Sequence, residues 1–245
     1  MRFVILCLLF MVSPLLAASS SGPHLDKANI QIEDREAIKR GAKVFVSYCL
    51  SCHSAALMRY SRIGDDLGMT DEEVAAELVT TGRKVGDTME VAMYPEDANR
   101  WFGVVPPDLS VISRARGVDW LYTYLRSFYR DDSRPWGVNN TVFKDVGMPH
   151  VLWELQGLQE AVWETVQTAD GNSQQVMSGL KLVQPGKLGA EEYDALVHDL
   201  VTFLAYLGEP SKLQRQQLGK WVLLFLFVFL ILVILLKREY WKDIH

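Results

Sequence analysis

The stretch Cys49-Leu50-Ser51-Cys52-His53 is the strongest signal in this chain of 245 residues. In a C-x-x-C-H run, two thiols can add to the vinyl groups of a haem as thioethers, and the histidine that follows can bind the iron. Cysteines three positions apart lie on one face of a helix, which is the mechanical reason for the spacing. The run therefore predicts one covalent haem c, attached through Cys49 and Cys52 and ligated by His53.

Two other kinds of site that use closely spaced cysteines fit the sequence less well. A zinc site needs a second pair of Cys or His residues at ligand spacing, and the sequence contains none. A thioredoxin-like redox pair follows an apolar strand within a βαβ unit. The run from Ile32 to Tyr48 instead has apolar residues at helical spacing among charged ones. Covalent haem is the favoured interpretation, and a periplasmic thiol oxidoreductase is the less favoured alternative.

Composition and charge exclude several classes of protein. Apolar residues make up 49% of the chain and charged residues 22%, so the chain can bury a core and is not intrinsically disordered. The formal net charge of −5 argues against nucleic acid as a partner, because phosphates attract basic surfaces. The chain has three cysteines, too few for a scaffold held together by several disulfides.

The N-terminal end has the features of a secretory signal peptide. Arg2 precedes an apolar run that continues to Leu16, and small residues follow it up to Ala18. We therefore predict a signal peptide over residues 1–18 and an exported haem domain over residues 19–210. Export agrees with the haem motif, because c-type haem is attached outside the bacterial cytoplasm.

The C-terminal end predicts a membrane anchor. Trp221–Leu236 is an uninterrupted apolar run that spans about 24 Å as a helix, and its neighbours lengthen it. Basic and aromatic residues follow, as is typical of a membrane interface. Because the signal peptide places the preceding domain outside, we expect that domain on the periplasmic side of a bacterial inner membrane. The predicted segments are a linker over 211–217, a lipid-embedded transmembrane helix over 218–236 and a cytoplasmic tail over 237–245.

Periodicity predicts a mainly helical domain with one small hairpin. Four segments have apolar residues every three or four positions, which is typical of helices packed on one face. Asp170-Gly171-Asn172 is a strong hairpin turn signal. We expect helices over 32–48, 71–79 (with Thr70 as N-cap), 119–128 (with Asp119 as N-cap) and 191–207, strands over 161–168 and 175–183, and a loop over 131–150.

The second axial position of the haem iron has two candidates in one short segment. Val146-Gly147-Met148-Pro149-His150 places a thioether and an imidazole two residues apart, on the same side of an extended backbone. The other methionines lie too close to His53 or in charged and loop segments, where surface exposure or gap filling is the more common role. The residues alone leave Met148 and His150 open.

Several blocks along the mature chain carry a resemblance to one family. They are Arg40-Gly41, Cys49–His53 followed by Arg59-Tyr60, Pro106-Pro107-Asp108-Leu109-Ser110, Arg114-Ala115-Arg116, Gly147-Met148-Pro149 and Glu209-Pro210. In this order they resemble cytochrome c1, the haem-bearing subunit of the cytochrome bc1 complex. The resemblance implies a mainly α fold: a cytochrome c-like helical haem domain with a small β-hairpin insertion and one C-terminal transmembrane helix.

The resemblance also implies roles around the haem. The methionine of the G-M-P block is the distal iron ligand in the family, which implies Met148 here. The second arginine of the R-A-R block contacts a haem propionate, which implies Arg116. Animal members carry a tyrosine near the position of Trp120 that reaches a propionate too, and Trp120 keeps a hydrogen-bond donor there. Trp120 and Pro107 complete the expected haem-binding residues.

The function implied by the resemblance is a one-electron relay within a quinol–cytochrome c oxidoreductase. Electrons arrive from a Rieske iron–sulfur protein and leave to a soluble or membrane-bound cytochrome c, in a dimeric assembly that includes cytochrome b. The chain itself is expected to transform no substrate. A membrane-tethered monohaem cytochrome of another respiratory chain is the alternative, and co-purification with cytochrome b and a Rieske protein would separate the two.

Overall fold

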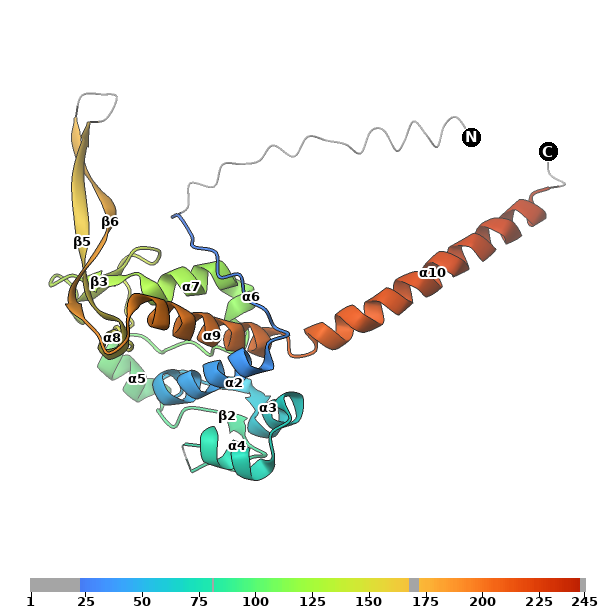
Figure 1. Ribbon diagram of the computed structural model, residues 1–245, viewed down its shortest axis with the longest axis horizontal. Helices are drawn as coiled ribbons and strands as arrows, with labels where there is room; N and C mark the ends of the chain where they lie inside the picture. The colour runs from blue at the N-terminus through green and yellow to red at the C-terminus, as the bar shows by residue number, and fades with distance from the viewer. Residues whose placement is uncertain (1–22, 81, 168–171, 243–245) are drawn as a thin grey trace.

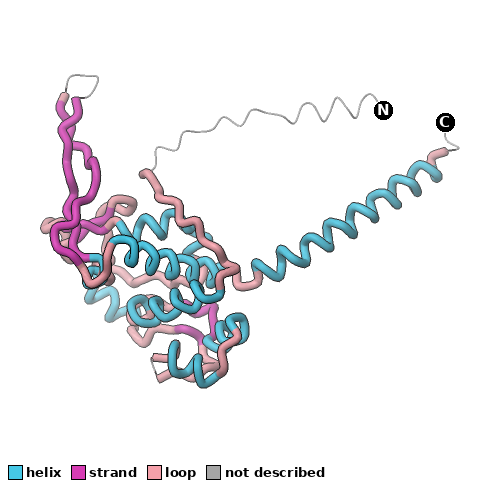
Figure 2. The backbone as a smooth tube through the Cα atoms, viewed as in Figure 1, coloured by secondary structure: helices cyan, strands magenta, loops and turns pink. Residues whose placement is uncertain are grey.

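The computed structural model describes residues 23–80, 82–167 and 172–242. Figure 1 and Figure 2 show a helical domain, a projecting hairpin and a long C-terminal helix that extends away from the domain. Helices account for 48% of the residues and strands for 17%, which confirms the predicted, mainly helical fold class. The predicted signal peptide over residues 1–18 lies outside the described residues.

Two neighbouring helices, α2 (Arg35–Val44) and α9 (Ala190–Gly208), form the centre of the domain (Figure 1). They approach closely because Gly41 has no side chain: a Cβ there would overlap the backbone carbonyl of Asp199. The Arg40 guanidinium donates to both carboxylate oxygens of Asp199, at 2.6 and 3.1 Å. A steric contact and a bidentate ion pair therefore determine how α2 lies against α9.

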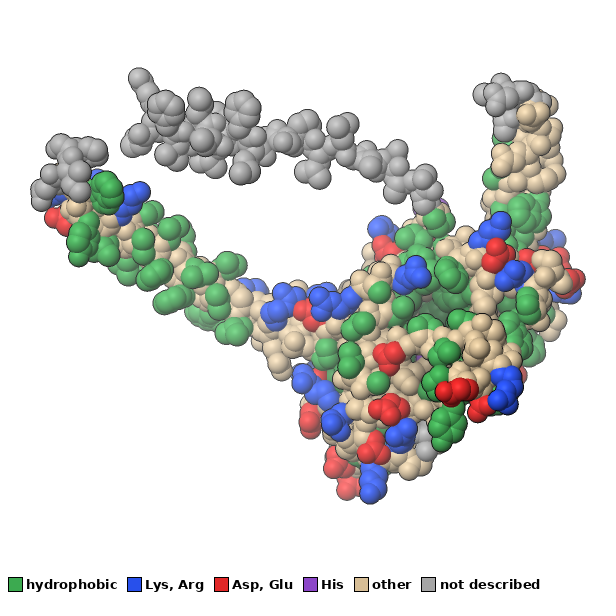
Figure 3. Space-filling model, turned by 180° about the vertical axis from the view of Figure 1, so that it is seen from behind, with side chains coloured by type: hydrophobic (Ala, Val, Ile, Leu, Met, Phe, Trp, Pro, Cys, Tyr) green, Lys and Arg blue, Asp and Glu red, His purple; other side chains and the backbone are tan. Residues whose placement is uncertain are grey.

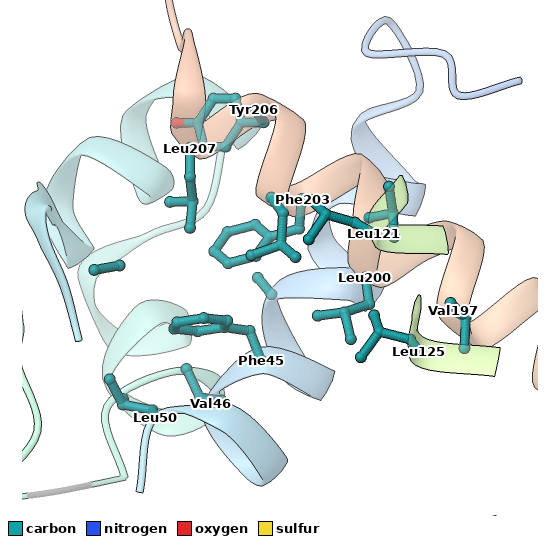
Figure 4. Close-up of a cluster of buried hydrophobic side chains, with 14 of the residues drawn as sticks. Phe45, Val46, Leu50, Leu121, Leu125, Val197, Leu200, Phe203, Tyr206 and Leu207 are labelled. Carbon is teal, nitrogen blue, oxygen red and sulfur yellow. The ribbon is translucent and has the colours of Figure 1, made fainter. Parts of the chain in front are cut away.

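Aromatic and aliphatic side chains fill the space around this helix pair (Figure 4). The rings of Phe45, just after α2, and Phe203, on α9, lie 5.4 Å apart. The helix α7 (Val118–Arg126) also packs on α9 and contributes Leu121 and Leu125 to the core. Removal of these large side chains from water is the main term that stabilises the domain.

Short helices and two-stranded antiparallel sheets surround the core. The predicted N-cap of one helix is confirmed: Glu73 N–H donates to the Thr70 hydroxyl at 3.2 Å, and Thr70 N–H donates to the Glu73 carboxylate at 2.9 Å. These elements are α3 (Tyr60–Leu67), α4 (Asp71–Glu77), α5 (Pro95–Phe102), α6 (Ile112–Arg116), α8 (Trp153–Gln156), the pair β1 (Ala55–Arg59) and β2 (Thr88–Met89), and the pair β3 (Phe128–Arg130) and β4 (Val138–Asn140).

Two helix boundaries differ from the predictions. The helix expected over 32–48 is α-helical only to Val44, after which the chain continues as a π-helix. The helix expected to be capped by Asp119 begins one residue earlier, at Val118. The Asp119 carboxylate instead accepts hydrogen bonds from Lys27 Nζ at 2.7 Å and Ala28 N–H at 2.9 Å. Its role is to hold the N-terminal arm on the domain.

Two β features also differ. The loop expected over 131–150 contains β4, because Val138–Asn140 pairs with β3 immediately after α7. The predicted hairpin is present but longer than expected: β5 (Gly157–Gln167) pairs with β6 (Ser173–Pro185). The base of the hairpin packs against β3, and the strands pair there beyond the predicted ranges 161–168 and 175–183. Figure 1 shows this hairpin projecting from the domain.

The C-terminal helix α10 (Lys212–Tyr240) begins within the segment 211–217 that was expected to be a linker, so most of that segment is helical. Residues Gln214–Tyr240 have a mean hydropathy of 2.9 in their most apolar window, and none of that window is buried in the protein. Figure 3 shows hydrophobic side chains along this helix with basic side chains near both ends. This helix is therefore long enough and apolar enough to cross a membrane.

The crossing of α2 and α9 generates a stability prediction. Gly41→Ala should lower the free energy of unfolding by about 1–3 kcal/mol, because overlap with the Asp199 carbonyl outweighs the higher helix propensity of alanine. Gly86→Ala is the matched control, since a Cβ at Gly86 meets no atom within 4 Å. Urea unfolding followed by circular dichroism measures both variants, and equal stability of the two would contradict the proposed contact.

Candidate haem-binding site

The C-x-x-C-H run follows α2 through a change of helical geometry. Phe45–Cys49 forms a π-helix, η1, in which the Leu50 N–H reaches back five residues at 3.0 Å. The N–H groups of Cys52 and His53 then both donate to the Cys49 carbonyl, at 3.0 and 2.8 Å. Such widened turns are frequent at functional sites. This turn brings two unpaired thiols and one imidazole to the wall of a single cavity.

The cavity has a volume of about 330 Å³ and a largely apolar lining. Its wall combines the C-x-x-C-H run with residues from 102–109, parts of α6 and α7, residues from 143–151, and two leucines of α9. Volume and lining are both in the range of cofactor pockets. All seven predicted site residues line this cavity: Cys49, Cys52, His53, Pro107, Arg116, Trp120 and Met148.

The imidazole of His53 is oriented by the backbone of the P-P-D-L-S block. His53 Nδ1 lies 2.8 Å from the Pro107 carbonyl oxygen. A carbonyl only accepts, so Nδ1 carries the proton and Nε2 keeps its lone pair for a metal. Leu109 N–H donates to the Ser54 carbonyl at 2.7 Å and holds the two segments together. Burial lowers the pKa of His53, which favours the neutral ring that ligation needs.

Met148 reaches the cavity, and its thioether already has a polar partner there. The hydroxyl of Tyr124, on α7, donates to Met148 Sδ at 3.4 Å. Burial raises the pKa of Tyr124, so this hydroxyl is a protonated donor at neutral pH. A thioether sulfur has two lone pairs, so a hydrogen bond to one leaves the other for an iron.

His150, the rival candidate, is turned into the core. Its ring is buried and stacks on Phe128, with centroids 4.8 Å apart and an interplanar angle of 1°. It is not among the cavity-lining residues. Burial lowers the pKa of His150 to about 4, so the imidazole is neutral. The structure therefore brings Met148, and not His150, to the same cavity as His53.

Arg116 and Trp120 lie together at the wall of the cavity. The Arg116 guanidinium carbon is 5.1 Å from the Trp120 ring centroid and 5.6 Å from that of Phe143. Arg116 is exposed, and within the described part of the chain no carboxylate lies within ion-pair distance of it. Its charge is thus free to meet an anionic group such as a propionate. The Trp120 ring stacks on that of Tyr124 with centroids 4.8 Å apart, so it contacts both Arg116 and Tyr124.

The state of the cysteines argues against thiol redox chemistry. Burial, with a smaller contribution from the neighbouring Cys52, raises the pKa of Cys49 to about 12. A redox-active cysteine needs the opposite shift, because the thiolate is the nucleophile. No group of three or more His, Cys, Asp or Glu residues that could hold a metal ion occurs among the described residues, so zinc is not supported either. Two thiols, a neutral imidazole, a thioether and a free cation around an apolar cavity fit a covalent haem.

Sequence reasoning missed several residues of the cavity as site residues. Tyr124 belongs to the helix predicted over 119–128 and Phe143 to the loop predicted over 131–150, and both line the cavity. Leu200 and Leu204 belong to the helix predicted over 191–207, and they line the cavity from α9. The local sequence does not distinguish an apolar helix residue that lines a cavity from one that packs in the core. The difference depends on which other elements face that residue.

Comparison with known proteins identifies the family. The model of the Cytochrome C1 family matches residues 27–180 and 186–244. The chain belongs to the cytochrome c1 family. Cytochrome c1 proteins carry one covalent c-type haem, which confirms the predicted cofactor, and they act in respiratory electron transport.

Two curated relatives align over their whole length with all of this chain. Cytochrome c1 of Allochromatium vinosum is 49% identical over 246 residues. A protein of Nitrosomonas europaea named ammonia monooxygenase gamma subunit is 51% identical over 247 residues. Among solved structures, a chain of a hyperthermophilic respiratory Complex III aligns with 100% of this chain and 97% of its own, with a TM-score of 0.42 and 17% identity.

The attachment site of this cytochrome c1 chain generates a prediction for the thiols. Cys49→Ala or Cys52→Ala should each remove one thioether, and the double variant should carry no haem that survives denaturing electrophoresis, because no other described cysteine lines the cavity. Haem staining of the denatured gel is the measurement. If the denatured double variant still stains for haem, the haem is attached at a site other than Cys49 and Cys52.

The distal position generates a second prediction. Met148→Leu keeps the volume but removes the sulfur, so the reduction potential of the haem should fall by roughly 100 mV or more, and the far-red absorption band of methionine–iron ligation should disappear. His150→Phe is the control: it keeps a ring on Phe128 and should leave both signals intact. Loss of the band in the His150 variant alone would reverse the assignment.

Proposed function

We propose that this chain is the membrane-anchored electron-transfer subunit of a quinol–cytochrome c oxidoreductase. It accepts single electrons from a Rieske iron–sulfur protein and passes them to a soluble or membrane-bound cytochrome c, in a dimeric complex with cytochrome b. One observation carries the proposal: in a chain of the cytochrome c1 family, His53 and Met148 face one apolar cavity beside the two cysteines of the haem motif.

The residues at the cavity are suited to holding an electron carrier rather than a catalyst. When bound, the haem iron supplies a one-electron ferric–ferrous couple. His53, oriented by Pro107, and Met148 would both bind the haem iron, so that the protein itself supplies the ligands that oxygen or a substrate would otherwise replace. The thioether favours ferrous iron and so raises the potential. Arg116 supplies positive charge for a propionate, and the apolar wall excludes water.

The name of the Nitrosomonas europaea relative suggests a second function, as a subunit of an ammonia monooxygenase. Oxygen activation needs an open coordination position on a metal. Ligation of the iron by both His53 and Met148 would therefore disfavour catalysis at this site. A chain with these ligands could still donate electrons to another enzyme. The identity of its partners therefore distinguishes three functions: a subunit of a quinol–cytochrome c oxidoreductase, a subunit of a monooxygenase, and a free-standing membrane-tethered cytochrome.

The proposed location is the periplasmic side of a bacterial inner membrane. The helix α10 is apolar on all sides and unburied over its most apolar window, so it needs lipid or other transmembrane helices around it. Glu209 accepts a hydrogen bond from Arg215 at 2.6 Å across the start of α10, so the domain joins the helix through an ion pair rather than an open linker. We propose that this short junction keeps the cavity near the membrane surface, within reach of a Rieske domain.

The experiment that tests this function is purification of the tagged full-length chain from native membranes in mild detergent. A b-type cytochrome and a Rieske centre should co-purify, and added quinol should reduce the haem of this chain. Met148→Leu is the matched variant: it should co-purify with the same partners, but its reduction by quinol should slow at least tenfold, because a lower potential makes the electron step unfavourable. Isolation with a monooxygenase, or without cytochrome b, would contradict the proposal.

A further inference from the structure

Tyr124 lies where it can act on the thioether that the proposed function assigns to the iron. Its hydroxyl donates to Met148 Sδ at 3.4 Å, across the 24 positions that separate α7 from the G-M-P block. Sulfur is a weak acceptor with a large radius, so a contact of this length is a hydrogen bond. The cavity that Tyr124 lines is largely apolar, and Leu125 and Val146 are among its other lining residues. The hydroxyl is therefore a directed polar group in an apolar surrounding.

The position of this hydroxyl does not depend on Met148. The Tyr124 ring is buried, stacks on Trp120 with centroids 4.8 Å apart, and meets the edge of Phe128 at 5.1 Å. The backbone carbonyl of Tyr124 accepts a hydrogen bond from Asn140 Nδ2 at 2.8 Å, which ties α7 to β4. Ring and backbone are thus both held by neighbours. A donor fixed in this way is preorganised toward the sulfur.

The geometry points to Tyr124 as a positioning residue that raises the reduction potential through Met148. One sulfur lone pair would bind the iron, while the other accepts the hydrogen bond from the Tyr124 hydroxyl. The hydrogen bond withdraws electron density from sulfur, which weakens its donation to ferric iron more than to ferrous iron. It also restrains the methionine in the conformation that faces the cavity. This inference rests on the proposed function, because it requires Met148 to be the distal ligand.

The test is Tyr124→Phe in the full-length holoprotein, read by redox titration of the haem. The substitution removes one oxygen and keeps the ring on Trp120 and Phe128. At a fixed ambient potential, the ratio of ferrous to ferric haem should fall by about three- to tenfold, the size expected for one hydrogen bond. A tenfold change corresponds to about 59 mV for a one-electron couple. The far-red band should remain, because the sulfur is still present.

Two further variants separate this role from packing. Tyr122→Phe removes a hydroxyl from the same helix, but Tyr122 faces the Arg126 guanidinium at 4.4 Å and does not line the cavity, so the ratio should not change. Replacement of Tyr124 by 3-fluorotyrosine keeps the ring and makes the hydroxyl a stronger donor. The ratio should then rise. A purely structural role for Tyr124 predicts no such opposite shifts.

An unchanged ratio in Tyr124→Phe with the far-red band present would overturn the inference while leaving the proposed function intact. Absence of that band from the unsubstituted protein would overturn both, because Met148 would not be the ligand. If Tyr124→Phe fails to take up haem, the 3-fluorotyrosine protein decides: a raised ratio supports the inference, and an unchanged one contradicts it.

Discussion

The close crossing of α2 and α9 is the contact on which the position of the cavity depends. Because Gly41 lets α2 rest on the backbone of Asp199, Phe45 at the end of α2 comes to lie against Phe203 of α9. The haem motif leaves that end through η1, so its thiols and imidazole meet a wall that α9 partly forms. A bulkier residue at position 41 would move the whole attachment turn relative to this wall.

Each expected iron ligand is oriented by a hydrogen bond from a different part of the chain. The His53 ring is held by the Pro107 carbonyl, 54 residues away in sequence. The Met148 thioether receives the Tyr124 hydroxyl, which belongs to a helix that also packs on α9. Supporting partners of this kind set ligand basicity and orientation as much as the ligands themselves do. In this chain the two partners differ in chemistry: a carbonyl accepts from His53, and a hydroxyl donates to Met148.

The same domain separates electron transfer from membrane attachment. The cavity lies within a packed helical body, whereas α10 extends away from that body with its apolar surface uncovered (Figure 1; Figure 3). The Arg215–Glu209 ion pair joins the two parts over a few residues. The projecting hairpin β5–β6 is a second extension, and none of its described residues lines the cavity.

Local signals in the sequence were enough to establish the haem motif, the mainly helical fold, the hairpin and the apolar C-terminal helix, because spacing and periodicity depend on neighbours along the chain. They could not choose between Met148 and His150, which lie two residues apart with similar local surroundings. They also could not distinguish Tyr124 from the other apolar residues of its helix, or predict the hydrogen bond between His53 and the Pro107 carbonyl. Those assignments come from contacts between segments 24 to 54 residues apart. Only the packing of α7, α9 and the G-M-P segment decides which side chains face the cavity, because that packing turns Met148 toward it and His150 onto Phe128.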